Sequence, residues 1–129
     1  MDQVTIFPVK RGPFVAGTLS EGVVRATVNA GVATFTANVD AIGQAILTFS
    51  DTAAITIANP IGTPTDGQML SFLLLNSSGG VQGTITWGNK FKVGTVTKPA
   101  NGQTRTLSFF WDATLAFWRQ IDADRDVPV

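Results

Sequence analysis

The side chains that most often carry out catalysis are scarce in this 129-residue sequence. It contains no histidine for proton transfer near neutral pH, no cysteine nucleophile and no tyrosine. Two paired carboxylates can hydrolyse a glycosidic bond without histidine. However, the acidic residues Asp40, Asp51, Asp66 and Asp112 stand singly at expected turns. We therefore expect no catalytic residues and no enzymatic activity.

One acidic cluster has the spacing of a metal site. Asp122, Asp124 and Asp126 alternate along the chain, as the first ligands of many calcium-binding loops do. The turn glycine and the distal glutamate of an EF-hand are missing, and a solvated tail is the competing interpretation. We expect no metal and no other cofactor, and these three aspartates are the candidate ligands if a metal does bind.

The aromatic side chains of the second half offer a binding chemistry. Aromatic faces can stack on sugars, but aromatics at alternating strand positions are more typical of a hydrophobic core. Phe110 and Trp118 lie on the strand faces opposite to those of the expected core residues Phe109 and Phe117. We therefore select Phe110 and Trp118 as the candidates for an interface or a ligand. The aromatic set is Trp87, Phe91, Phe109, Phe110, Trp111, Phe117 and Trp118.

The N-terminal twenty residues differ in character from the rest. The segment from Phe7 to Phe14 carries two prolines, one glycine and the adjacent basic pair Lys10 and Arg11. Proline favours an extended backbone and is confined to the edges of sheets. Two interpretations remain open, an arm laid across a neighbouring molecule and an ordinary edge strand.

The amino-acid composition favours association with other protein molecules. Nine basic residues balance nine acidic ones, and only 14% of the chain is charged against 44% that is hydrophobic. A free monomer needs more surface charge to stay dispersed, and nucleic-acid binding needs a basic face. No signal peptide is visible, and the apolar stretch 69–75 is too short to cross a bilayer. We expect a protein made in a cytoplasm, without nucleic-acid or membrane partners.

The elements that must position these residues are strands. Valine, threonine, isoleucine and phenylalanine alternate with polar residues in short runs, which is typical of half-buried strands. The run 69–75 is apolar on both faces except at Ser71, so it predicts a covered central strand or a subunit interface. The expected strands are Val4–Phe7, Phe14–Leu19, Val23–Val28, Val32–Val39, Ala45–Phe49, Ala54–Ala58, Met69–Leu75, Gly83–Trp87, Thr104–Trp111 and Leu115–Ile121.

This spacing predicts one all-β domain, a single antiparallel β-sandwich of jelly-roll type. Residues 1–20 form the arm or edge strand, 21–122 the sandwich and 123–129 a short tail. Proline within 59–68 predicts a long, ordered loop there. Asp66-Gly67 and Asn101-Gly102 are the dipeptides best suited to hairpin tips or corners with positive φ.

Three segments together resemble a β-domain of tailed-phage virion proteins. The loop from Asn59 to Gln68 reads NPxGTPxDGQ, residues 84–91 read TxTWGxxF, and an aromatic strand pair follows at 109–118. The resemblance covers about half of the chain. It implies a virion building block rather than an enzyme, and it is also the source of the expected homotrimer.

The resemblance leaves a capsid role and a receptor-binding role open, and a baseplate or neck connector is a third possibility. Because the chain has little room for the shaft of a tail fibre, the favoured expectation is a bacteriophage capsid decoration protein, or cement protein. Such a protein binds the major capsid protein on the outer capsid surface and clamps neighbouring capsomers, here through the arm residues Phe7, Lys10, Arg11 and Phe14. The alternative is a tail-fibre or tail-tip module that recognises a host surface glycan.

Overall fold

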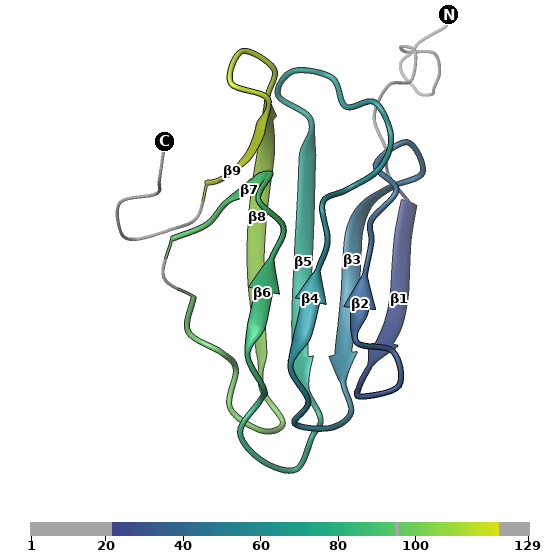
Figure 1. Ribbon diagram of the computed structural model, residues 1–129, viewed down its shortest axis with the longest axis vertical. Helices are drawn as coiled ribbons and strands as arrows, with labels where there is room; N and C mark the ends of the chain where they lie inside the picture. The colour runs from purple at the N-terminus through teal and green to yellow at the C-terminus, as the bar shows by residue number, and fades with distance from the viewer. Residues whose placement is uncertain (1–21, 95, 122–129) are drawn as a thin grey trace, which may run out of the picture.

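The computed structural model describes residues 22–94 and 96–121, and it is built from strands alone over these ranges. Each strand coincides with a run of alternating or continuous apolar residues, as expected for chains that bury one face. The strands are β1 (Gly22–Val28), β2 (Thr34–Phe35), β3 (Ile42–Phe49), β4 (Ile55–Ile57), β5 (Met69–Asn76), β6 (Ile85–Trp87), β7 (Phe91–Lys92), β8 (Thr104–Asp112) and β9 (Phe117–Gln120) (Figure 1).

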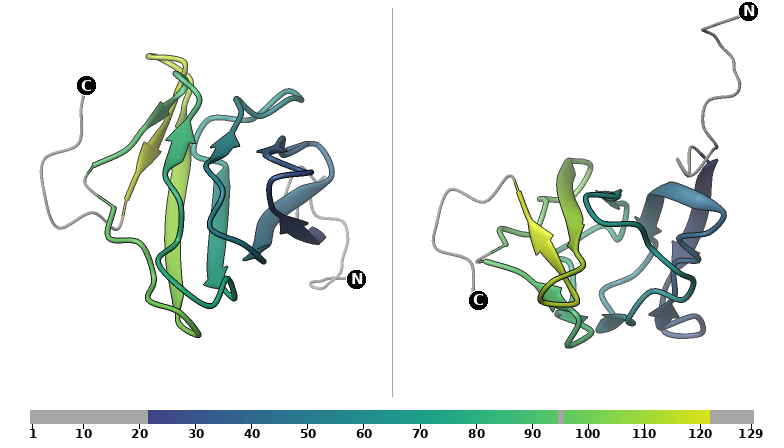
Figure 2. Two further views of the ribbon diagram at one scale, coloured as in Figure 1. Left: turned by 60° about the horizontal axis from the view of Figure 1, so that its bottom comes forward. Right: turned by 90° about the horizontal axis from the view of Figure 1, so that it is seen from above.

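Two sheets lie face to face. The large sheet has six strands in the order β1-β3-β5-β8-β9-β7, and the small sheet has three in the order β2-β4-β6 (Figures 1 and 2). From β1 to β6 the chain passes from one sheet to the other with every strand, and each strand pairs in parallel with the next strand of its own sheet. We call one large-sheet strand with the small-sheet strand that follows it a coil. Three coils stack side by side.

The prediction of a β-sandwich with all strands antiparallel is therefore wrong in the direction of pairing. Among the described strands, five pairs are parallel and two, β5–β8 and β8–β9, are antiparallel. A jelly roll is built from antiparallel strands, so this connectivity differs from it. The physical reason is the length of the connections, because parallel strands need a crossover of a dozen or more residues. Here β2 and β4 lie within those crossovers.

The core lies between the two sheets. Large-sheet side chains of one parity point inward, and those of β3 and β5 are completely enclosed: Ala45, Leu47 and Phe49, and Leu70, Phe72 and Leu74. The small sheet covers them with Ile55 and Ile57. Phe72 lies at the centre, with edge-on ring contacts to Phe35, Trp87, Phe91 and Phe109 at centroid distances of 5.4 to 6.4 Å. Burial of these apolar faces is the main stabilising contribution.

The central position expected for the run 69–75 is confirmed, but among the described residues the strand is covered by a second sheet on one face only. In the large sheet β5 has β3 on one side and β8 on the other. Its second apolar face, with Leu73 and Leu75, alternates with the buried residues Leu70, Phe72 and Leu74 and so points away from the small sheet. We call this side of the large sheet the outer face.

The loop between β4 and β5 is ordered by hydrogen bonds, as predicted from its prolines and glycines. Gly67 and Gly102 both adopt positive φ, at 83° and 78°, as expected for Asp-Gly and Asn-Gly corners. Gly62 also has a positive φ of 107°, and a side chain there would meet Asp40.

Candidate functional site

The first motif loop is fastened to the second motif segment by Asn59. The Asn59 side-chain amide donates to Asn89 Oδ1 at 2.9 Å, and its carbonyl oxygen accepts from the Lys90 backbone N–H at 2.9 Å. A Cβ on Gly88 would lie 2.3 Å from Asn59 Oδ1, so only glycine allows this approach. The side chain of Asn59 and the missing side chain of Gly88 are therefore both required for this contact.

The same loop is fastened to the aromatic hairpin by Asp66 and its neighbours. Asp66 Oδ1 accepts from the Ala113 backbone N–H at 2.9 Å, and the Gly67 N–H donates to the Trp111 carbonyl oxygen at 2.8 Å. The buried Gln68 side chain donates to the Val39 carbonyl oxygen at 2.9 Å. The polar residues of this motif thus hold three separate segments together, and they do not converge on a reaction centre.

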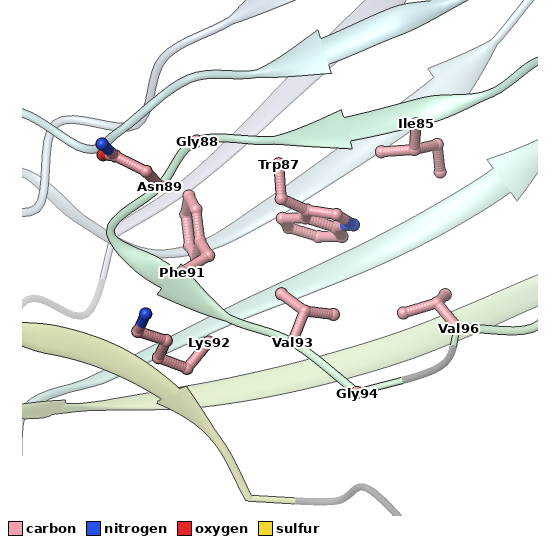
Figure 3. A pocket seen from close by; sticks show the side chains of 9 residues that line it. All are labelled: Ile85, Trp87, Gly88, Asn89, Phe91, Lys92, Val93, Gly94 and Val96. Atoms are coloured by element: carbon pink, nitrogen blue, oxygen red, sulfur yellow. The ribbon is translucent and has the colours of Figure 1, made fainter. Parts of the chain in front are cut away.

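A groove of about 530 Å³ lies between β6 and the segment that follows β7 (Figure 3). The rings of Trp87 and Phe91, with centroids 5.2 Å apart, form its aromatic part. Ile85, Val93 and Val96 continue it as an apolar surface, and Asn89 and Lys92 lie at the other end.

The described side chains of the groove offer aromatic, apolar and amide contacts. Asn89 Oδ1 is occupied by the Asn59 amide, and the Lys92 ammonium group lies 4.1 Å from the centroid of the Phe117 ring. The described lining residues include no serine, threonine, cysteine or carboxylate, and their one amine is that of Lys92. A partly exposed tryptophan beside an apolar wall can hold a flat apolar surface, such as one face of a sugar ring.

A second cluster lies at the far edge of the large sheet. Lys92 pairs with Arg119 across β7 and β9, and Arg119 pairs with Phe110 across β9 and β8. The ammonium groups of Lys90 and Lys92 both lie over the Phe117 ring, at 5.3 and 4.1 Å from its centroid. Sequence reasoning selects Phe110 here but misses Phe117 and Arg119.

The prediction for Trp118 is wrong. Its side chain is only 2% exposed, belongs to the core and packs against Trp111 at a centroid distance of 5.4 Å. The prediction assumes a three-residue connection that places Phe117 on the core face, whereas Asp112 pairs with Phe117 and four residues form the loop. One residue more or less in a hairpin loop exchanges the two faces of the following strand. Phe110 does lie on the outer face, where it is partly exposed.

The remaining predicted sites fall outside the described residues. The arm residues Phe7, Lys10, Arg11 and Phe14 precede Gly22, and Asp122, Asp124 and Asp126 follow Ile121. Within the described ranges, no group of three or more acidic, histidine or cysteine side chains is arranged to hold a metal ion. Over the same ranges the chain forms no helix long and apolar enough to cross a membrane.

The four described carboxylates have structural partners. Asp40 accepts from the Thr63 N–H, Asp51 from the N–H groups of Ala30 and Ala53, and Asp112 from those of Thr114 and Leu115. With Asp66 bound to Ala113, each carboxylate satisfies backbone donors in a loop or turn. These contacts agree with the turn-forming role that their single positions in the sequence indicate.

Comparison with family models, curated proteins and solved structures finds no match to this chain.

Proposed function

We propose that this chain is a structural protein of a tailed-phage virion, a capsid decoration or cement protein without catalytic activity. It binds the major capsid protein on the outer surface of the shell, after synthesis in the host cytoplasm, and clamps neighbouring capsomers. The observation that carries the proposal is the division of polar groups. The described carboxylates and the motif amides brace the fold, while a broad sheet face with apolar and cationic side chains is left for contact with another protein.

The mechanism of clamping is multivalent attachment. Three copies associate as a homotrimer, and each copy contributes modest contacts to an adjacent capsomer. Linking such contacts converts weak single attachments into strong overall attachment. The arm with Phe7, Lys10, Arg11 and Phe14 is part of this proposal as an additional shell contact. Nucleic acid and membranes are not partners in it.

The test uses purified shells that lack this protein. We expect the added protein to co-sediment with the shells at a fixed copy number, to appear on their outer surface in electron micrographs, and to raise their resistance to heating. A Lys10→Ala and Arg11→Ala variant should bind more weakly than a Lys98→Ala control. Protein found on the tail instead, or absent from the shell at saturating concentration, would refute this function.

The groove supports a second candidate, a tail-tip or fibre module that recognises a host surface glycan. The partly exposed Trp87 ring is the observation that favours it, because aromatic faces stack on sugar rings. Glycan binding by the isolated protein should then be lost in Trp87→Ala and kept in Phe110→Ala, which changes an aromatic residue of the outer face. Equal loss in both variants, or no glycan binding, would exclude this candidate.

A further inference from the structure

The outer face of the large sheet has an apolar centre. On β5 the side chains that alternate with the core residues are Met69, Ser71, Leu73 and Leu75, and Met69 is 45% exposed. Across the strands Leu73 lies beside Ile46 of β3, and Met69 lies beside Phe110 of β8. The small sheet covers the opposite side, and no described strand packs on the outer face (Figure 2). A contiguous apolar patch of this kind marks an interaction site.

The two flanks of this face are cationic. Arg25 has the outward parity on β1, at one edge of the sheet, in register with Ile46. Lys92 and Arg119 lie in register on β7 and β9 at the other edge. Among the described carboxylates only Asp112 lies at an outward position of the large sheet. Its Oδ1 accepts hydrogen bonds from the backbone N–H groups of Thr114 and Leu115 in the turn that follows. Counted over the described residues, the face therefore carries an excess of positive side chains around an apolar centre.

These cations lack carboxylate partners within the described residues. Lys90 and Lys92 rest over the Phe117 ring, and Arg119 Nη1 is buried and has no hydrogen-bond partner among residues 22–94 and 96–121. A guanidinium group that is already partly desolvated loses less water when a carboxylate binds to it, and Arg–carboxylate pairs are strong and directional. The chemistry that completes this face is thus a carboxylate-bearing surface.

A second copy of the same face does not supply that chemistry. Sheets that pack face to face keep their strands within about 30° of each other. Two copies packed outer face to outer face can place β1 of one copy over β1 of the other, or over the opposite edge of the other sheet. Arg25 then meets Arg25 in the first orientation and Arg119 in the second, and like charges in an interface oppose association. Charge complementarity therefore favours a different surface, in which acidic groups surround an apolar centre.

The size of the face suits a stable contact. The six strands range from two residues in β7 to nine in β8, and at about 3.3 Å per residue and about 4.8 Å between strands they together cover roughly 600 Å² in projection. A standard interface buries about 800 Å² of accessible surface on each partner. Accessible surface follows the contours of the side chains, so a patch with that accessible area has a smaller projected area. One such face per copy is enough for a specific attachment.

We propose that the outer face is the docking surface of this protein and that its partner is an acidic protein surface with an apolar centre. The inference rests on the proposed function, in which this partner is the outer surface of the capsid shell. Leu73 and Phe110 contact the apolar centre, and Arg25, Lys92 and Arg119 pair with the surrounding carboxylates. The orientation of the bound protein follows, because the small sheet then points away from the shell.

The test compares two full-length variants of equal net charge. Arg25→Gln with Arg119→Gln removes two charges from the outer face, and Arg105→Glu changes the net charge by the same amount. Arg105 is exposed and lies on β8 beside Leu74, so its parity is that of the core face. We expect the double variant to bind shells about tenfold more weakly and with less dependence on salt, whereas Arg105→Glu should bind like the wild type.

The apolar centre is tested in the same way. Leu73→Thr should weaken binding to shells several-fold, and Val81→Thr, at a position 80% exposed outside the face, should not. A second probe does not involve shells. A carboxymethyl resin at pH 7 and low salt should retain this chain of formal net charge zero, and it should release the double variant before Arg105→Glu.

The outcomes separate this inference from the proposed function. Shells that bind the wild type and the double variant equally well would overturn the inference and leave the function standing. Shells that do not bind the wild-type protein would refute the function. The inference would then be supported if the resin releases the double variant before Arg105→Glu, and overturned if the two variants elute together. Binding to phosphatidylglycerol vesicles in place of shells would assign the face to a membrane and overturn it. Dissociation of a homo-oligomer by Leu73→Thr would assign the face to a second copy and overturn it as well.

Discussion

Replacement of Phe72 by alanine tests the division of β5 into a core face and an outer face. Phe72 is fully buried and makes four ring contacts with centroid distances between 5.4 and 6.4 Å. Phenylalanine-to-alanine changes in cores cost about 3 to 5 kcal/mol, a range that already includes lost ring contacts, and the four ring pairs of Phe72 favour its upper end. We expect a loss of about 5 kcal/mol, comparable to the whole stability of many small domains.

The matched control is Leu73→Ala, one residue further along the same strand. Leu73 points to the outer face, where truncation leaves no enclosed cavity, so the expected loss is about 1 kcal/mol or less. Urea denaturation followed by tryptophan fluorescence at low protein concentration measures both losses. A Leu73→Ala loss close to that of Phe72→Ala would refute the assignment of the two faces, because residues of the same chain would then have to cover Leu73.

Two further predictions concern glycine and a buried amide. Gly88→Ala should lower the free energy of unfolding by about 3 kcal/mol, since the new Cβ would displace Asn59 and disturb hydrogen bonds worth about 1 kcal/mol each. Gly67→Ala, which has a positive φ but no atom within 4 Å of the new Cβ, should lose only about 1 to 2 kcal/mol in the same denaturation assay. Equal losses of unfolding free energy in Gly88→Ala and Gly67→Ala would argue against a clash between the new Cβ at position 88 and Asn59. Gln82→Met should raise the thermal midpoint by a few degrees, because both amide atoms of Gln82 are buried and lack a hydrogen-bond partner among the described residues. A lower midpoint would show that the amide is hydrogen-bonded in solution.

The sequence identifies most of the strands and their inward faces. Alternation of apolar residues places Leu47 and Phe49 inside, and the two apolar faces of the run 69–75 indicate a central strand. Alternation does not reveal whether neighbouring strands run in the same direction, because parallel and antiparallel strands share a period of two. The coils were therefore not predictable from these runs.

The candidate surfaces depend on features that the sequence specifies only weakly. The length of one hairpin loop decides which of Phe117 and Trp118 is buried, and neighbouring loop lengths are equally compatible with the residues from Asp112 to Ala116. Ala116 has a φ of 60°, which is rare for alanine and gives no signal in the sequence. The basic cluster forms only because β9 brings Arg119 beside Lys92, and the two are distant along the chain.

The stacking of coils has a consequence for the order in which the protein folds. Val24 pairs with Ala45 and Ala45 pairs with Phe72, so each large-sheet strand meets the strand of the preceding coil. Such contacts close loops of moderate length, which favours growth of the sheet from one coil to the next. Because β8 pairs with β5 and β9 pairs with β8, we expect both to join the sheet after β5 is in place. Until then, the edge of β5 and the inward side of Phe72 remain accessible to other chains, which is the stage most vulnerable to aggregation.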